Sequence, residues 1–86
     1  MEAYKVIKYP LSTEKSMRMM ESENKLVFVI DKDASKKDVK AAVEKMFKAR
    51  VDKVNTFIDA RGKKKAYVKF NIETPAIDVA TELGMM

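Results

Sequence analysis

One segment organises the whole chain, and it reads Arg61-Gly62-Lys63-Lys64-Lys65-Ala66-Tyr67-Val68-Lys69-Phe70. Its second half alternates apolar residues with polar or aromatic ones, which is typical of a strand with one buried face. Its first half, with Gly62 in the connection 60–64, predicts a tight antiparallel hairpin between strands over 51–59 and 65–72. The segment holds five positive charges and no acid. This concentration favours a polyanion as partner, because each cation that meets a phosphate releases condensed counterions.

Outside this hairpin, the pattern predicts two further strands and three helices. Five consecutive apolar residues within a strand over 26–31 indicate that both its faces are covered, so this strand should be central in the sheet. A first strand over 4–8 ends before Pro10, since the residue before proline is pushed out of helical space. Ser12 or Thr13 is expected to cap a helix over 13–22. Ser35 and Asp38 form a capping-box variant that begins a helix running to Ala49.

The last predicted element is a short helix with Thr74 as its cap, Pro75 in its first turn and Gly84 at its end. The order is therefore β-α-β-α-β-β-α. It predicts the α+β class: a small sandwich in which a four-stranded, largely antiparallel sheet packs with helices. The 86 residues are too few for two cores, so residues 1–86 are expected to form a single domain.

The apolar residues of the second helix predict a stripe that faces the sheet, formed by Val39, Val43, Met46 and Phe47. We interpret Met17 and Met20 as core filler. The terminal Met85 and Met86 are expected to fray.

Composition argues against several classes of protein. The chain has no cysteine and no histidine, which removes thiolate metal ligands, disulfides and the usual general base. We therefore expect no catalytic residue, no metal site and no cofactor. The longest apolar run spans five residues, far below the roughly 20 that a bilayer helix needs. We expect a soluble cytoplasmic protein whose net charge of +5 attracts acidic partners.

The hairpin cations are the first candidates for a nucleic-acid site, although lysines in a turn also serve simply to protect a sheet edge. Further basic residues in segments expected to be exposed favour phosphate contacts. These candidates are Lys8, Lys15, Lys36, Lys37, Lys40, Arg61, Lys63, Lys64, Lys65 and Lys69. The polar pair Asn55-Thr56 is unusual within an apolar strand. It either forms ordinary internal contacts or hydrogen-bonds to sugars or base edges.

Four motifs, in this order along nearly the whole chain, resemble the ribosomal protein L23 family. They are Pro10-Leu11-Ser12-Thr13-Glu14-Lys15-Ser16; Ala34 with Lys36-Lys37-Asp38-Val39-Lys40-Ala41-Ala42-Val43-Glu44; Val54-Asn55-Thr56; and Lys64-Lys65-Ala66-Tyr67-Val68. The compact form is similar to the archaeal members, because the hairpin around Gly62 is short.

The resemblance implies a non-enzymatic constituent of the large ribosomal subunit, located in the cytoplasm at the rim of the polypeptide exit tunnel. The implied partners are large-subunit rRNA, neighbouring ribosomal proteins, and factors that meet nascent chains, such as the signal recognition particle. By position, Lys64, Lys65, Asn55 and Thr56 would face rRNA, and we place Ser12 with them. Glu14 would lie on the outer, factor-docking surface, where we also place Arg18.

The residues themselves also allow two other interpretations. Ala66-Tyr67-Val68-Lys69-Phe70 is similar to the end of the aromatic strand motif of free-standing RNA-recognition domains, but Lys63 and Lys64 occupy the places of the Gly-aromatic pair. A small acylphosphatase-like enzyme would use a similar frame. It would need an arginine in an anion-binding loop near the N-terminus, and the segment before Val6 has none.

Overall fold

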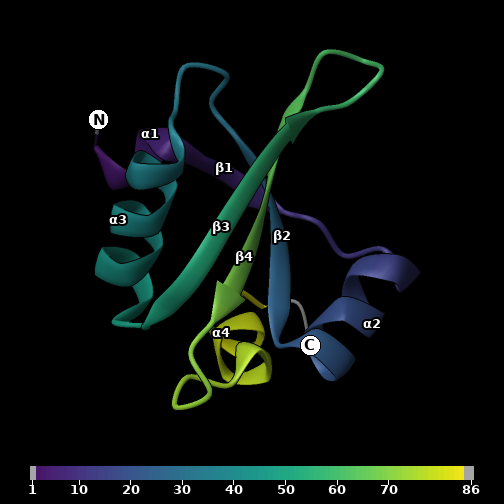
Figure 1. The fold of residues 1–86 in the computed structure, drawn as a ribbon, viewed down its shortest axis with the longest axis vertical. Helices are drawn as coiled ribbons and strands as arrows, with labels where there is room; N and C mark the ends of the chain where they lie inside the picture. The colour runs from purple at the N-terminus through teal and green to yellow at the C-terminus, as the bar shows by residue number, and fades with distance from the viewer. Residues whose placement is uncertain (1, 85–86) are drawn as a thin grey trace.

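The computed structural model describes residues 2–84, which form a four-stranded sheet with helices on both of its faces. The elements in chain order are α1 (Ala3–Val6), β1 (Ile7–Pro10), α2 (Glu14–Glu23), β2 (Lys25–Ile30), α3 (Lys36–Phe47), β3 (Val51–Ile58), β4 (Lys64–Phe70) and α4 (Ala76–Glu82), as Figure 1 shows. The strand order across the sheet is β1-β2-β4-β3, and every neighbouring pair is antiparallel. The predicted α+β class is confirmed.

Strand β2 lies between β1 and β4, and all its residues from Leu26 to Ile30 are buried. Leu26, Phe28 and Ile30 belong to the main core beneath α3 and α4, whereas Val27 and Val29 point to the opposite face. The uninterrupted apolar run is therefore explained by burial of both faces of this strand. The prediction of a central strand is confirmed.

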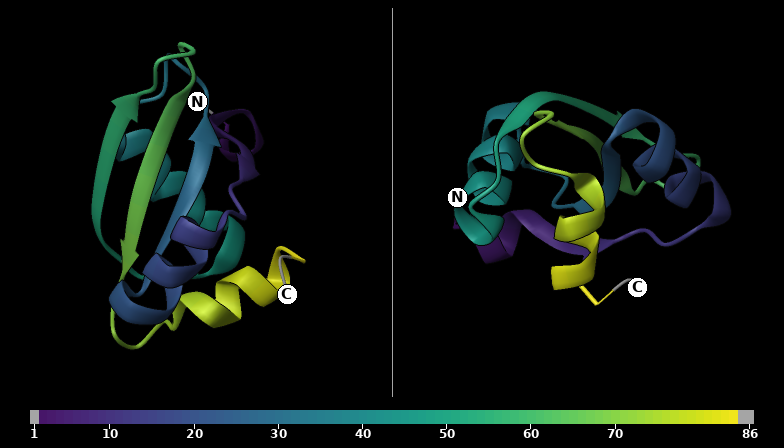
Figure 2. Two further views of the ribbon diagram at one scale, coloured as in Figure 1. Left: turned by 90° about the vertical axis from the view of Figure 1, so that its right-hand side faces the viewer. Right: turned by 90° about the horizontal axis from the view of Figure 1, so that it is seen from below.

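The two faces of the sheet differ in what covers them. Ala66, Val68 and Phe70 of β4 are buried in the core with α3 and α4, while their neighbours in the strand point the other way. In the left view of Figure 2, α3 lies behind the sheet and α2 lies in front of one end of β2. The front of β3 and β4 has no helix over it. We call this side of the sheet the open face.

Local sequence explains where the helices begin and end. Thr13 caps α2 and Ser35 caps α3, each in a reciprocal capping box, with Ser16 and Asp38 as the respective partners. The pKa of Asp38 lies below its usual value, because backbone and side-chain hydrogen bonds from Ser35 favour the charged carboxylate. Gly84 adopts a positive φ of 75° after α4, as expected for a residue that ends a helix.

The structure corrects the expectation at the N-terminus. Residues 4–8 were expected to form a strand, but the chain makes one helical turn, in which Lys5 and Val6 both donate backbone hydrogen bonds to the carbonyl of Glu2. Val6 and Ile7 are consecutive and both buried, which a strand with one exposed face cannot provide. The turn buries Val6 beside α3, and the strand begins only at Ile7.

Two smaller expectations were also wrong. Thr74 does not cap α4: Pro75 occupies that position, and the free backbone N–H of Ala76 instead donates to Oδ1 of Asn24, 2.6 Å away. Met46 is 43% exposed and faces a surface hollow beside α1, and Ala42 takes its place in the buried stripe of α3. Met20 is buried and Met17 packs against the core, as expected. The expected fraying at Met85 and Met86 lies outside the described residues.

Candidate nucleic-acid interface

A groove runs along the open face above β2. It consists of three adjoining hollows with volumes of about 370, 300 and 270 Å³. Val29 lines the first two and Val27 lines the third, so these side chains of β2 form the floor. One wall is the segment from Lys8 into the first turns of α2, and the other is the β3–β4 hairpin. We call it the basic groove.

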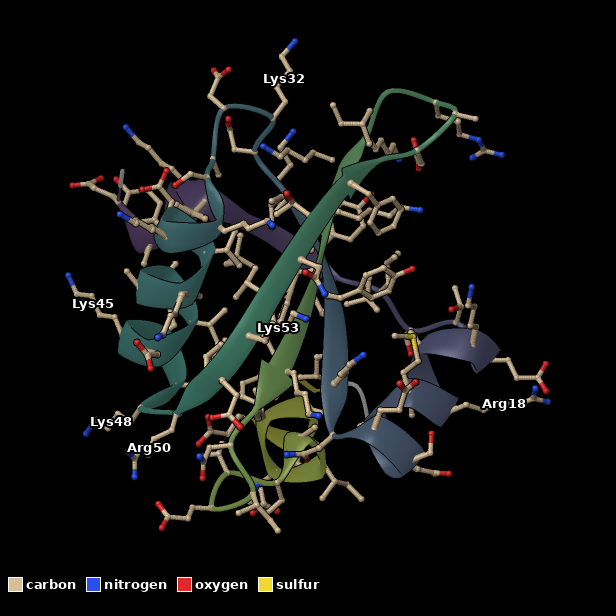
Figure 3. All side chains as sticks on the ribbon, viewed as in Figure 1. Arg18, Lys32, Lys45, Lys48, Arg50 and Lys53 are labelled. Carbon is tan, nitrogen blue, oxygen red and sulfur yellow. The ribbon has the colours of Figure 1, made fainter. Side chains whose placement is uncertain are left out.

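Positive charge converges on this groove from separate parts of the chain. The turn before α3, which carries Lys32, lies at the same end of the sheet as the β3–β4 loop (Figures 1 and 3). Asp59 is the one carboxylate among the residues that line the three hollows. The seven cations that line them are Lys8, Lys15, Lys32, Arg61, Lys63, Lys64 and Lys65. Seven positive charges against one negative charge make the groove attractive to a polyanion.

Three consecutive lysines of the hairpin have different contacts. Lys63 Nζ donates to the hydroxyl of Tyr9 at 3.3 Å, and Lys64 Nζ donates to the backbone carbonyl of Ala34 at 2.7 Å. Lys65 forms an ion pair with Asp59 at 3.0 Å. Lys64 therefore ties β4 to the turn before α3, while Lys63 stays exposed at the rim of the groove.

The ion pair of Asp59 and Lys65 also shapes the hairpin loop. The hydrogen bond from Lys65 and those from the backbone N–H groups of Lys63 and Arg61 hold the pKa of Asp59 below its usual value. Asp59 Oδ1 accepts both backbone hydrogen bonds at 2.9 Å. The loop is thus closed by the carboxylate of Asp59, and its cationic side chains, those of Arg61 and Lys63, are exposed.

The open face continues beyond the groove onto β3 and β4. Phe57 and Tyr67 stack across the two strands, with ring centroids 4.9 Å apart and an interplanar angle of 18°. Asn55 pairs with Tyr67 in the strand register, and Lys53 pairs with Lys69. Lys53 is exposed, and Figure 3 labels it beside β3. This face combines stacked aromatic rings, an amide and exposed lysines, the groups that contact RNA in other sheet surfaces.

Comparison with known proteins assigns the chain to a family. The family model for ribosomal protein L23 matches residues 5–81. The large ribosomal subunit protein uL23 of the archaeon Methanococcus aeolicus is 52% identical over 85 residues, which cover 99% of each chain. The chain belongs to the ribosomal protein L23 family. It is thus a ribosomal protein, and its cytoplasmic location follows from that membership.

The structure of this L23-family chain brings only some of the predicted site residues together. Lys8, Lys15, Arg61, Lys63, Lys64 and Lys65 all line the basic groove. Ser12 is exposed between Leu11 and Thr13 but does not line the hollows itself, and Asn55 and Lys69 are exposed on the open face. Apart from Lys64, whose side chain alternates with that of Lys65 along β4, these residues form one continuous side of the molecule.

The other predicted residues lie elsewhere. Thr56 points to the helix-covered face, opposite to Asn55, because neighbouring residues in a strand alternate between faces. One flat partner cannot meet both of them. Lys36, Lys37 and Lys40 are exposed on α3, behind the sheet. Their role in RNA binding stays a prediction, independent of the groove.

Glu14 and Arg18 form an exposed ion pair on α2, with Arg18 Nη2 2.9 Å from Glu14 Oε1. Their side chains are 84% and 76% exposed, respectively, and Figure 3 shows Arg18 pointing into solvent. The side of α2 that carries this ion pair is therefore a charged, exposed helix face. No described helix is long and apolar enough to cross a membrane.

Sequence reasoning missed four residues of this L23-family site. Lys32 was hidden because it lies between Asp31 and Asp33, so the local charge is negative. Tyr9 was assigned only as the end of a strand. Phe57 and Tyr67 could have been found, because strand alternation places both on the face of Lys65.

Proposed function

We propose that this chain is a structural constituent of the large ribosomal subunit and that its basic groove binds large-subunit rRNA. The observation that carries the proposal is the convergence of seven cations and a single ion-paired carboxylate on one groove. Family membership supplies the ribosomal context. Phosphates recruited to the groove would fix the orientation of the protein without reading sequence.

The proposed role is structural rather than catalytic. Among the residues that line the groove, the ionisable groups are lysines, one arginine, Tyr9, Tyr67 and Asp59. The pKa of Asp59 is lowered by its hydrogen bonds. A general acid or base that works near neutral pH needs a shift in the opposite direction for a carboxyl group. The chemistry of the groove thus supports binding.

We further propose that the protein lies near the exit of the polypeptide tunnel and helps to dock nascent-chain factors such as the signal recognition particle. The motif resemblance supports this location. The exposed pair of Glu14 and Arg18 lies on α2, outside the groove, so an RNA-bound molecule could still present it to a protein partner. Binding to RNA and docking of a factor would then use different surfaces.

Incorporation into ribosomal particles tests the proposal. A tagged copy should sediment with large ribosomal subunits from cell lysate. Reversal of charge in the groove, by Arg61→Glu with Lys63→Glu, should displace the copy to the light fractions. The matched control is Lys45→Glu with Lys48→Glu, the same charge change at the far end of α3 (Figure 3).

The control separates the groove from general attraction between charges. If both double variants leave the particles equally, net charge rather than the groove explains the binding. If the unaltered copy stays in the light fractions, the ribosomal role itself is wrong.

A further inference from the structure

The part of the basic groove beside α2 is lined mainly by apolar and aromatic side chains. Phe57 and Tyr67 lie on the hairpin side, and Leu11 and Met19 lie on the opposite wall. Val27 forms the floor. Phosphates alone would not need such a lining, so this hollow suits a flat, uncharged group.

The aromatic pair is held rigidly by the sheet. Tyr67 pairs with Asn55 and Phe57 pairs with Lys65, so the two rings meet diagonally across β3 and β4. Both side chains are half-buried, and part of each therefore stays exposed. A partner that stacks on them need not order a flexible side chain, which removes one cost of binding.

The size and charge of the hollow fit a single nucleotide. Its volume of about 270 Å³ equals that of roughly nine water molecules at about 30 Å³ each, which is enough room for one nucleobase. Lys15 and Lys65 line the same hollow. Lys65 is ion-paired with Asp59 at 3.0 Å, so Lys15 is the cation that can meet a phosphate beside a base that enters the hollow.

Two of the three hydroxyl groups that line the hollow, those of Thr13 and Ser16, are already engaged. Thr13 Oγ1 accepts from the backbone N–H of Ser16, and Ser16 Oγ donates to the carbonyls of Leu11 and Thr13. These contacts hold the start of α2. The hollow thus offers stacking surface, positive charge and one further hydroxyl group, that of Tyr67. Stacking of this kind tolerates any base, because every base has a π face.

We propose that this hollow binds one unpaired nucleobase of RNA, stacked against Phe57 and Tyr67, with Lys15 at a flanking phosphate. The inference rests on the proposed rRNA binding and deepens it, since it assigns single-stranded RNA to this end of the groove. A paired helix keeps its bases stacked inside and cannot fill the hollow, whereas unpaired loop bases commonly stack on aromatic side chains.

Binding to two probes tests the inference. The first is an in vitro transcript of large-subunit rRNA, and the second is a short oligouridine with one 2-aminopurine. Tyr67→Leu keeps an apolar side chain but removes the ring, and it should weaken binding to both by roughly five- to 150-fold. The slope of log affinity against log salt should not change, because no charge is lost. Tyr67→Phe is the matched control and should bind like the unaltered protein.

Fluorescence of the 2-aminopurine reports stacking directly. It should be quenched by the unaltered protein and by Tyr67→Phe, and not by Tyr67→Leu. Phe57→Leu provides a second test if circular dichroism shows that Tyr67→Leu is unfolded. Equal affinity and equal quenching for the ring-free and ring-bearing variants would overturn the inference and leave rRNA binding intact. Failure of the unaltered protein to bind the rRNA transcript would instead overturn the proposed function.

Discussion

Removal of Arg61 and Lys63 should flatten the salt dependence of rRNA binding by a calculable amount. Both residues line the basic groove and are exposed, and the hydrogen bond from Lys63 Nζ to the Tyr9 hydroxyl lies between exposed side chains at the rim. Each phosphate contact contributes about 0.7 to 0.9 to the slope of log affinity against log salt. The double variant Arg61→Ala with Lys63→Ala should therefore lower the slope by about 1.4 to 1.8.

Lys64 provides the contrasting case within the same run of sequence. Its Nζ donates to the carbonyl of Ala34 at 2.7 Å, and this contact joins the hairpin to the turn before α3. A hydrogen bond that involves a charged group contributes about 1.5–3 kcal/mol, and the partial exposure of Lys64 reduces this to about 1–2 kcal/mol. Lys64→Ala should lower the free energy of unfolding by that amount and change the salt slope much less than the double variant.

The two variants are compared by fluorescence anisotropy with the rRNA transcript over a series of KCl concentrations, and by urea unfolding without RNA. The reasoning requires opposite results in the two assays: a flatter slope with little loss of stability for the double variant, and the reverse for Lys64→Ala. If Lys64→Ala flattens the slope as much as the removal of one loop cation, Lys64 binds a phosphate despite its hydrogen bond to Ala34. If the double variant keeps the original slope, the loop is not part of the phosphate-binding surface.

Three further predictions concern stability, docking and pH. Asn24→Ala should lower the free energy of unfolding by about 3 kcal/mol, because it removes several hydrogen bonds and strains a position with φ of 55°. Asn24→Gly removes the same hydrogen bonds without the strain, so it should lose about 1 kcal/mol less in the same urea assay. Equal losses for the two variants would contradict the backbone part of this reasoning. Glu14→Ala should leave incorporation into large subunits intact and reduce co-sedimentation of the signal recognition particle. The control Glu21→Ala, on the same helix, should change neither. If Glu14→Ala prevents incorporation, Glu14 serves the fold or contacts RNA. The pKa of Asp59 lies below its ordinary value of 3.8, so its contribution to stability is complete above that value and is lost as pH falls through the lower, folded pKa. Asp59→Asn should therefore show a smaller loss of stability between about pH 4 and pH 2, and an unchanged acid transition would refute the assignment.

The sequence alone was enough to predict the sheet and most of its connections. The alternation in 65–70, the uninterrupted run in 26–30 and the pairing of Ser35 with Asp38 are local signals, and each corresponds to one local structure. The single turn of α1 could not be predicted, because four residues carry almost no helical periodicity. Its existence depends on the burial of Val6 against the core, which is a tertiary effect.

The junction at Asn24 shows a second limit of sequence reasoning. Its side-chain amide donates to the carbonyls of Phe70, Asn71 and Thr74 and accepts from the N–H of Ala76. These partners lie 46 to 52 residues away along the chain. An asparagine at the end of a helix is common for its left-handed backbone alone, so nothing in the local sequence indicates that this one also caps α4.

The candidate site shows the same division between local and long-range information. A run of lysines suggested one continuous clamp, yet the strand that begins at Lys64 sends alternate side chains to opposite faces. Lys64 therefore stabilises the turn at Ala34, and Lys65 is held by Asp59. The charge that the run cannot supply comes instead from Lys8, Lys15 and Lys32, which only the fold brings to the groove.

This arrangement explains why the density of charge in a sequence is a poor measure of binding strength once the charges enter a strand. About half of such a run faces the core, where each cation must find an internal acceptor or lose its hydration without compensation. The phosphate-binding capacity depends on the cations that share one face, whatever their distance along the chain. For this protein that principle makes Lys32, which lies between two aspartates, a better candidate for a phosphate contact than Lys64, which lies within the most basic segment. Lys32→Ala should accordingly flatten the salt slope more than Lys64→Ala, and the reverse order would show that the run itself, rather than the groove, binds the RNA.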